Sequence, residues 1–338
     1  MKNIILSFIL TIALFSCTDS NKSKSASSII YTSGGRTSEV LIVISKGLWD
    51  SPLGDSIRES FEQVPGWLPR NEPEYIVTRI SKKAFGSTYQ KQRNIFLIKK
   101  AEVNKAKVQF RKNMYAKPQT VVTIKGNSDK QLMHAFLAYK DKIRKSFHKN
   151  EVTRIAKAYS GLEVRTITKQ LDKKFGFHMV FPKGFYVAND KADFIWLRRP
   201  TRDVEEGVFI YTRPYTDTSS FSMQSMIAYR NEITKKYVPG PVDNSYMKVS
   251  DVFPPMSLIT EFKGAYASQL RTLWDVHGYA MGGPFVSYTF IDTAASRLIT
   301  IDGYIKAPKK EKRDLLLHIE AIFHSFAYTT VTDTINYK

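Results

Sequence analysis

The first region of the chain alternates short apolar runs with amphipathic segments. The continuous apolar run Val40–Ile44 is rich in branched side chains, which predicts a strand buried on both faces. A helix is predicted next, because Pro52 suits a first helical position and Leu53, Ile57 and Phe61 fall on one helical face. Further strands are predicted at residues 75–80, 94–98 and 120–125.

A second pattern, with a period of two, covers residues 107–117. Val108 and Phe110 face one way, while Lys107, Arg111 and Lys117 face the other. The alternation predicts one strand that displays a basic stripe.

A helical span is predicted to follow. Ser128 is a suitable N-cap with Gln131 at the capping-box position, and apolar residues continue at helical spacing through Phe147. The helical pattern resumes at residues 151–159, breaks at Gly161 and continues to residue 174. The polar face of its first half is basic, with Lys130, Lys140, Lys142, Arg144, Lys145 and Lys149.

The second region reads as short strands with two helices, at residues 223–237 and 308–326. We therefore expect an α+β fold, with two domains of mainly antiparallel sheet packed with helices and joined by the helical span. The predicted units are a signal peptide at 1–16, a tether at 17–38, an N-terminal α/β domain at 39–127, a basic helical span at 128–174, a C-terminal α+β domain at 175–328 and a tail at 329–338.

The first residues have the form of a lipoprotein signal. Lys2 precedes an apolar run of about twelve residues, which is too short to cross a bilayer core of about 30 Å. Small Ser16 stands before Cys17, the one cysteine of the chain. Cleavage there would expose Cys17 for acylation, and two or three acyl chains would hold the protein on a membrane. The alternative is a buried structural cysteine behind an ordinary signal peptide.

An acylated Cys17 would leave no thiol for a disulfide, a nucleophile or a metal site. Serine-rich, polar sequence follows to Ser38 and is typical of a flexible tether. We expect a cell-envelope protein that is lipid-anchored, on the outer membrane and facing the periplasm.

The net charge of +20 is concentrated in one part of the chain. Residues 71–175 carry 25 basic and 8 acidic side chains, so 17 of the 20 excess charges lie there. Such a field attracts a polyanionic surface or an acidic partner. The alternative is a solvated face that only aids solubility.

The most distinctive local sequence is residues 270–285. Gly282, Gly283 and Pro284 predict a sharp hairpin turn that brings Trp274 near the following strand. In that interpretation Trp274 is a core residue. In the alternative, Arg271 and Trp274 form an exposed recognition patch, and exposure of the indole distinguishes the two.

Several separate motifs occur in order along the chain. They are the lipobox and tether, Trp49-Asp50 with Pro52, Arg93-Asn94-Ile95, Arg271-x-Leu-Trp, Gly-Gly-Pro-Phe at 282–285, Asp302-Gly303-Tyr304, and Ala307-Pro308 with Lys309, Lys310 and Arg313. Together they resemble the Bacteroidota lipoproteins grouped as domain-of-unknown-function family 4837. The resemblance extends over nearly the whole chain and implies no reaction. The last region also resembles the sheet-and-helix folds of PsbP and Mog1, which implies a similar C-terminal fold but no function.

Catalytic and metal-binding patterns are weak. Six histidines include no His-Glu-x-x-His, so neither a metal nor a cofactor is predicted. Asp275 and His277 alternate on one strand and could act as a base and its orienter, yet no nucleophile motif accompanies them. A basic stripe beside aromatic residues can bind nucleic acid, but an envelope protein is not expected to meet it.

The sequence therefore predicts a non-catalytic binding or assembly module with a basic face for an anionic partner or surface, and Lys107, Arg111, Lys117, Arg271 and Trp274 are the candidate binding residues. The alternative is a periplasmic enzyme for a small ligand, such as a hydrolase, with a site near Arg271, Asp275 and His277.

Overall fold

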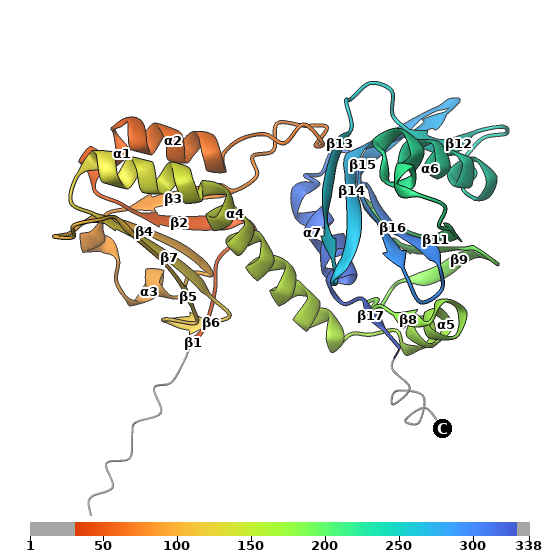
Figure 1. Ribbon diagram of the computed structural model, residues 1–338, viewed down its shortest axis with the longest axis horizontal. Coiled ribbons are helices and arrows are strands. Elements are labelled where there is room, and N and C mark those ends of the chain that lie inside the picture. The colour runs from red at the N-terminus through yellow and green to blue at the C-terminus, as the bar shows by residue number, and fades with distance from the viewer. Residues whose placement is uncertain (1–30, 330–338) are drawn as a thin grey trace, which may run out of the picture.

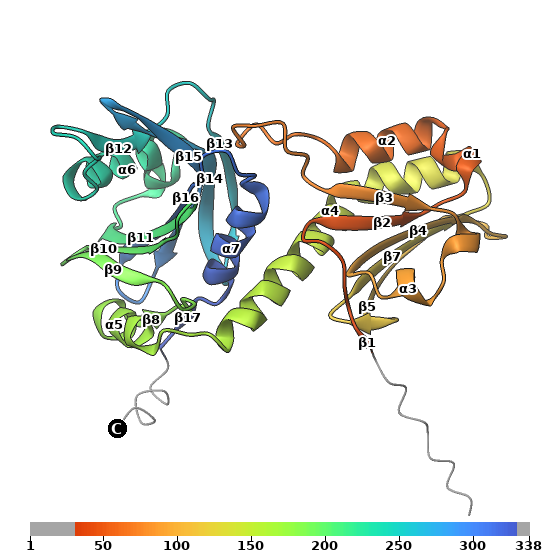
Figure 2. The ribbon, with the colours of Figure 1, turned by 180° about the vertical axis from the view of Figure 1, so that it is seen from behind.

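A computed structural model describes residues 31–329 (Figures 1 and 2). The predicted signal peptide, Cys17, most of the tether and nearly all of the tail lie outside these residues. The helices of the described part are α1 (Lys46–Trp49), α2 (Pro52–Phe61), α3 (Ser87–Gln90), α4 (Asp129–Ser160), α5 (Arg165–Phe175), α6 (Met223–Tyr237) and α7 (Arg313–His324).

The strands fall into two large sheets and two small pairs. They are β1 (Tyr31–Thr32), β2 (Glu39–Val43), β3 (Ile76–Ile80), β4 (Asn94–Lys100), β5 (Lys107–Lys112), β6 (Ala116–Lys117), β7 (Thr120–Gly126), β8 (Phe177–His178), β9 (Tyr186–Lys191), β10 (Phe194–Pro200), β11 (Glu205–Pro214), β12 (Tyr246–Val249), β13 (Met256–Phe262), β14 (Ala265–His277), β15 (Tyr279–Asp292), β16 (Arg297–Lys306) and β17 (Ala327–Tyr328).

The N-terminal domain contains a five-stranded sheet in the order β3-β2-β4-β7-β5. Helices α1, α2 and α4 cover one face, and their apolar side chains pack with those of Val40, Ile42 and Phe96. Leu41 and Val43 point to the opposite face, where Phe85 and Tyr115 cover them. The strand is therefore buried on both sides, as its continuous apolar run predicts.

The pairs between β3, β2, β4 and β7 are parallel, and only β5 runs antiparallel to its neighbour. The expectation of a mainly antiparallel sheet is therefore wrong for this domain. The reason is that β2 is joined to β3 through α1 and α2, and such a crossover returns the chain in the same direction.

The C-terminal domain is built on an antiparallel sheet in the order β12-β14-β15-β16-β11-β10-β9, with β13 beside the first half of β14. Val208 and Ile210 of β11 face α7, whereas Phe209 and Tyr211 face α6. This alternation sandwiches the sheet between helices (Figure 1). The α+β class is confirmed.

One long helix serves both domains. Phe136, Ile143 and Phe147 in the first part of α4 pack in the N-terminal core. Val152 and Tyr159, further along, pack in the C-terminal core. Figure 2 shows α4 running from one domain to the other. The predicted helical span therefore belongs to two cores at once.

The domains also meet through polar contacts at the start of α7. The buried carboxylate of Glu72 accepts hydrogen bonds from the backbone N–H groups of Lys312 and Arg313, at 2.7 and 2.9 Å. Arg313 in turn donates to the Pro73 carbonyl at 2.8 Å. Glu72 of the N-terminal half thus caps the N-terminus of α7 in the C-terminal domain. A negative charge is favourable at a helix N-terminus.

Two local predictions differ from the structure. The predicted strand 107–117 ends at Lys112, because Asn113 has a left-handed φ of 53° and begins a turn. The predicted hairpin turn at Gly282, Gly283 and Pro284 is wrong, because these residues lie inside β15.

The turn between β14 and β15 is instead made at Gly278, whose φ is 79°. Gly283 pairs with Trp274 within the ladder. A Cβ on Gly283 would lie 2.0 Å from the Ile305 carbonyl oxygen and 3.3 Å from the Trp274 indole nitrogen. The glycine is needed for close packing rather than for a turn.

Candidate functional site: a basic face and an interdomain polar cluster

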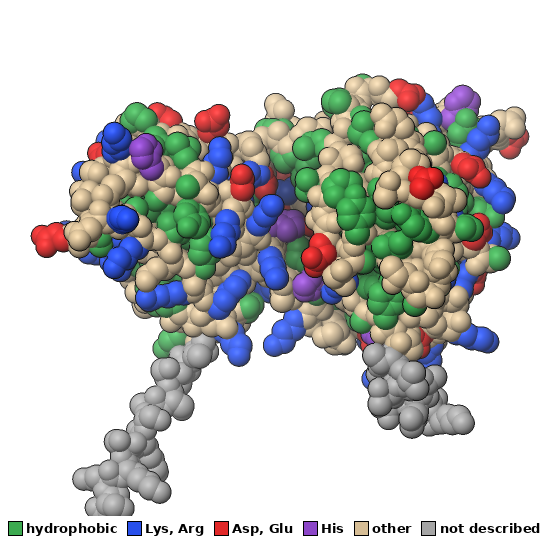
Figure 3. Space-filling model, viewed as in Figure 1, with side chains coloured by type: hydrophobic (Ala, Val, Ile, Leu, Met, Phe, Trp, Pro, Cys, Tyr) green, Lys and Arg blue, Asp and Glu red, His purple; other side chains and the backbone are tan. Residues whose placement is uncertain are grey.

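The predicted basic stripe is exposed on the edge of the N-terminal sheet. Lys107 and Arg111 lie on β5, the edge strand, and Lys117 lies on β6, and all three side chains are solvent-exposed. We call these three residues the basic face. Figure 3 shows Lys and Arg side chains gathered over the lower part of the N-terminal domain.

Within residues 31–329, none of these three cations has a carboxylate within 4.0 Å. The Arg111 guanidinium donates to the Met114 sulfur at 3.9 Å and to the Gln109 side-chain oxygen at 3.5 Å. These cations could also have a purely structural role. Charged side chains on an edge strand discourage pairing with the sheet of another molecule. An anionic surface would supply the charge that the basic face lacks.

A second group of polar side chains lies where the two domains meet. Glu320 of α7 accepts from Arg271 of β14 at 2.8 Å and contacts the His148 ring of α4 at 2.5 Å. The Arg271 guanidinium also lies over the Trp67 ring, 5.1 Å from its centroid. We call Arg271, Glu320 and His148 the interdomain cluster.

Electrostatics explains why Glu320 is tolerated at 8% side-chain exposure. Burial acts to raise the pKa of Glu320, but Arg271 and His148 outweigh it and lower that pKa to about 2. The carboxylate is therefore charged at neutral pH and ties α7 to α4. The interdomain cluster is therefore a network of ion-pair contacts that connects the two domains, and each charged group in it has a partner.

The structure places the Trp274 ring in the core, at 1% exposure. Its indole N–H donates to the Ile305 carbonyl at 3.3 Å, and the ring packs edge-on against Tyr304. No indole surface is left for a partner, so the geometry supports the core interpretation of Trp274 rather than an exposed recognition patch. Arg271 is likewise mostly buried, in the interdomain cluster.

The residues of the enzyme alternative are not brought together. Arg271 is bound by Glu320, whereas the Asp275 carboxylate lies 4.0 Å from the Lys248 ammonium. His277 is exposed and stacks on Tyr246. In the described residues these three side chains form no hydrogen bond or ion pair with one another, so no acid–base pair forms among them.

Several motifs of the family resemblance are packing devices. Asp302 forms a fully buried ion pair with Arg230 of α6 at 2.8 Å. Gly303 allows α7 to approach β16, because a Cβ there would lie 2.1 Å from Ile319. The Tyr304 hydroxyl donates to Glu205 at 2.6 Å and accepts from the Trp196 indole.

Asn94, from the motif Arg93-Asn94-Ile95, also has a packing role, in the N-terminal domain. The Asn94 amide donates to the buried Glu151 carboxylate of α4 at 2.9 Å and to the Glu39 carbonyl at 3.1 Å. This side chain therefore fixes α4 against the sheet.

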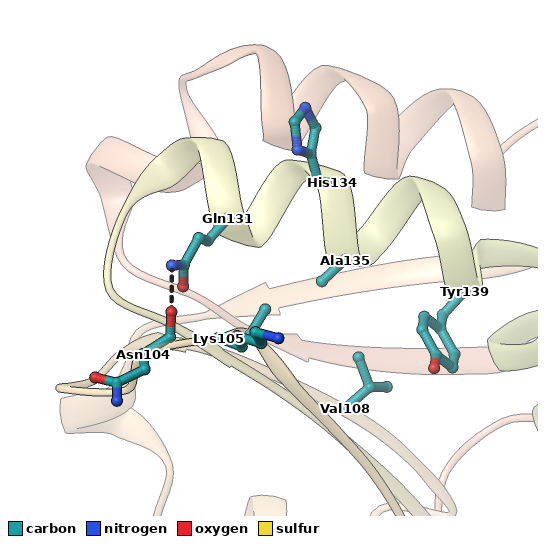
Figure 4. Close-up of a pocket in the computed structure, with 8 residues that line it drawn as sticks. Asn104, Lys105, Val108, Gln131, His134, Ala135 and Tyr139 are labelled. Atoms are coloured by element: carbon teal, nitrogen blue, oxygen red, sulfur yellow. Dashed lines mark hydrogen bonds between the residues drawn. The ribbon is translucent and has the colours of Figure 1, made fainter.

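Two cavities in the described residues are largely open to solvent. One of about 370 Å³ lies between α4 and the segment before β5, where His134 and Tyr139 stand on the helix above Lys105 and Val108 (Figure 4). The Gln131 amide donates to the Asn104 carbonyl at its end. These side chains show no hydrogen-bonded pairing of a nucleophile with a base.

Residues 31–329 contain neither a metal cluster nor a membrane-spanning helix. No three His, Cys, Asp or Glu side chains among them are grouped so that they could hold a metal ion. In the same residues, no helix is long and apolar enough to cross a membrane.

Sequence reasoning singled out Arg271 but missed Glu320 and His148, the other two members of the interdomain cluster. Glu320 and His148 are 172 residues apart in the chain, and neither belongs to a motif. Only the buried position of Glu320 on an otherwise apolar helix face could have indicated that it needs a partner.

The comparisons with known families divide the chain at the end of α4. Residues 164–325 match the family model described as domain of unknown function DUF4837, and residues 33–160 match that of domain of unknown function DUF8532. The DUF4837 match is thus confined to the C-terminal half, whereas the motif resemblance extended over nearly the whole chain. No curated protein matches this sequence.

Solved structures resemble part of the fold at low identity. They include a mutant of the protein Mog1, with 8% identity, a TM-score of 0.31 and coverage of 46% of this chain and 93% of that one. The Saccharomyces cerevisiae Ran-binding protein Mog1p has 9% identity, a TM-score of 0.31 and coverage of 46% and 92%. LpqN of Mycobacterium tuberculosis has 10% identity, a TM-score of 0.29 and coverage of 46% and 83%. Similarity at this level carries no functional argument.

Proposed function

We propose that this protein is an envelope lipoprotein of the Bacteroidota type, acylated at Cys17 and facing the periplasm from the outer membrane, that acts as a non-catalytic binding or assembly module. Its basic face engages an anionic partner or surface. The lipobox pattern before Cys17 supports the anchor. The absence of a contact among Arg271, Asp275 and His277 in the described residues favours this proposal over the enzyme alternative.

The observation that carries the binding proposal is the set of unpaired cations on β5 and β6. Most of the excess positive charge of the chain lies in residues 71–175, yet few of those cations form ion pairs. Exposed cations attract anions over a Debye length of about 8 to 10 Å. The polar tether predicted after Cys17 would let such a face reach a headgroup layer or a neighbouring acidic protein.

The anchor is tested by replacing Cys17 with serine. We expect wild-type protein in the membrane fraction, with mass spectrometry showing acyl chains on Cys17, and we expect the variant in the soluble fraction, because loss of the acyl chains removes the hydrophobic attachment. An unmodified thiol at Cys17 in mature membrane-associated protein would contradict the proposal.

The basic face is tested by the triple variant Lys107→Glu, Arg111→Glu and Lys117→Glu. The chain with Cys17→Ser is mixed with vesicles of phosphatidylglycerol and phosphatidylcholine, and the bound fraction is measured by sedimentation. Each removed cation near an anionic surface weakens binding by about 1 kcal/mol, so we expect a loss of at least about a hundredfold. Binding should also weaken as salt increases.

The matched control reverses three exposed cations of the C-terminal domain, Lys183→Glu, Lys191→Glu and Arg202→Glu. It changes the net charge equally, so a small effect would locate binding on the basic face. An acidic protein partner is sought in parallel by pull-down from envelope membranes. Equal retention of vesicles and of every captured partner by both triple variants would refute the basic-face proposal.

A further inference from the structure

The second of the two cavities lies in the C-terminal domain and is lined by charges of opposite sign. It has a volume of about 400 Å³. Its walls come from the turn before β10, the end of β11, helix α6 and the start of β16, and they include Asp193, Arg213, Tyr229 and Arg297. Small-molecule sites have volumes of about 300 to 1,000 Å³, so this cavity suits a ligand of amino-acid size.

The cation of this cavity is Arg213, which α6 and the segment before it hold in place. Its Nη2 group donates to the Ser220 carbonyl at 3.0 Å and to the Ser225 hydroxyl at 3.2 Å. The guanidinium carbon lies 4.5 Å from the centroid of the Tyr229 ring. Within residues 31–329, the Nε and Nη1 groups form no hydrogen bond and no carboxylate lies within 4.0 Å. These donors therefore remain for a ligand.

The anion of the cavity is Asp193. Its carboxylate accepts a hydrogen bond from the Tyr237 hydroxyl at 3.4 Å, and no cation of the described chain lies within 4.0 Å of it. The Thr212 N–H donates to the Asp193 carbonyl at 3.0 Å, which fixes Asp193 beside the residue that precedes Arg213. Asp193 and Arg213 thus line one cavity without forming an ion pair with each other.

The third charged residue of the cavity already has a partner. Arg297 donates to the Asp292 carboxylate at 2.9 Å and also to the Phe175 carbonyl. The charges that lack a protein partner are therefore one cation and one anion. A purely anionic ligand would neutralise only the first, and a purely cationic ligand only the second. A ligand that carries both charges can neutralise both.

An uncharged part of the wall completes the cavity. The Tyr229 hydroxyl donates to the Thr212 carbonyl at 3.2 Å. Burial raises the pKa of Tyr229 to about 12, so the phenol is neutral at physiological pH and keeps this hydrogen bond. Pro214 and Ala295 also line the cavity. Apolar surface thus lies beside the two unpaired charges.

We propose that this cavity binds a free α-amino acid with an apolar side chain, whose carboxylate contacts Arg213, whose ammonium contacts Asp193 and whose side chain packs against Tyr229. Arginine suits a carboxylate because its planar fork can donate two parallel hydrogen bonds. An α-amino acid carries both charges on one carbon, so a small molecule can reach both groups of a single cavity. The site lies in the other domain from the basic face and does not depend on it.

The test measures binding of leucine to the chain with Cys17→Ser by isothermal titration calorimetry. We expect saturable binding with a Kd of about 1 mM or tighter. Isocaproate has the same side chain and carboxylate but no amine, and isoamylamine has the amine but no carboxylate. Each analogue should bind at least about tenfold more weakly than leucine, because one protein charge would stay unpaired.

Two variants test the individual contacts. Asp193→Asn should lower the affinity for leucine about tenfold and leave the affinity for isocaproate unchanged, because isocaproate has no ammonium. Arg213→Gln should likewise weaken leucine and leave isoamylamine unchanged. A general loss of structure would not produce this pattern. The matched controls are Asp243→Asn and Arg202→Gln, exposed substitutions in the same domain, with an expected change below about twofold.

The outcomes are decisive even where one variant folds poorly. Asp193→Asn removes no ion pair of the described chain, so its midpoint of thermal unfolding should equal that of the wild type. Alanine and phenylalanine are titrated beside leucine as smaller and larger side chains. Absence of saturable binding by all three would overturn the site. Equal affinity for the preferred amino acid in the wild type and Asp193→Asn would also overturn it.

Two further results would contradict the proposal. Isocaproate binding as tight as that of leucine would identify a site for simple anions. The basic-face triple variant should keep the wild-type affinity for leucine, because its substitutions lie in the N-terminal domain. Loss of leucine binding in that variant would contradict the placement of the site.

Discussion

Replacing Asp302 with alanine is expected to lower the free energy of unfolding by about 3 to 5 kcal/mol, because the substitution leaves the Arg230 guanidinium charged in the core without its partner. Arg230 and Asp302 have side-chain exposures of 1% and 0%. The guanidinium also lies 3.8 Å from the centroid of the Phe285 ring. The midpoint of urea unfolding, followed by tryptophan fluorescence, gives the measurement.

The buried ion pair between Arg230 and Asp302 need not stabilise the fold relative to an apolar pair of similar size. Burial raises the pKa of Asp302 even though Arg230 opposes the shift, which indicates that desolvation is the larger effect on this carboxyl. The double variant Arg230→Met with Asp302→Leu should therefore recover most of the loss. Asp251→Asn, which removes an exposed partner of Lys248, serves as the surface control and should change stability by less than about 1 kcal/mol. A loss of similar size in the control and in Asp302→Ala would contradict the argument.

Replacing Glu320 with glutamine should lower stability at neutral pH by about 3 kcal/mol, because it removes the carboxylate that Arg271 and His148 share. The pKa of Glu320 is about 2 in the folded protein, below its ordinary value of 4.5. Its contribution to stability is therefore fully present above about pH 4.5 and is lost as the pH falls towards 2.

The pH dependence provides the diagnostic measurement. Wild-type stability should fall between about pH 4.5 and pH 2 more steeply than that of Glu320→Gln, and the two curves should converge at the acid end. Glu311→Gln, an exposed substitution just before α7, is the control and should follow the wild type. Curves for wild type and Glu320→Gln that remain parallel over this range would show that Glu320 does not carry the expected charge.

Local patterns predicted many of the elements because their causes are local. The helix predicted at residues 223–237 coincides with α6, with a serine cap before it and Pro239 beyond its end. Helix α2 begins at Pro52 with Ser51 as its cap, as its spacing predicts. Such helices depend on side chains within a few residues of one another.

The relative direction of neighbouring strands and the burial of individual side chains could not be predicted from local patterns. The apolar run at residues 40–44 indicated burial on both faces, but nothing within it distinguishes a parallel from an antiparallel neighbour. For Trp274, the pattern allowed both a core and a surface position. Its 1% exposure follows from contacts with Ile305 and Tyr304 on β16, about thirty residues further along the chain.

The amino-acid sequence by itself determined the α+β class, most element positions, the basic excess of residues 71–175 and the expectation of a lipid anchor at Cys17, because each depends on composition or on spacing along the chain. Only the tertiary structure decided which charges are paired and which are free. Glu320 meets His148 because α4 packs against both domains, and Arg271 reaches the same carboxylate from β14. Electrostatic interactions depend on distance in space, so their partners became identifiable only once the domains were placed together.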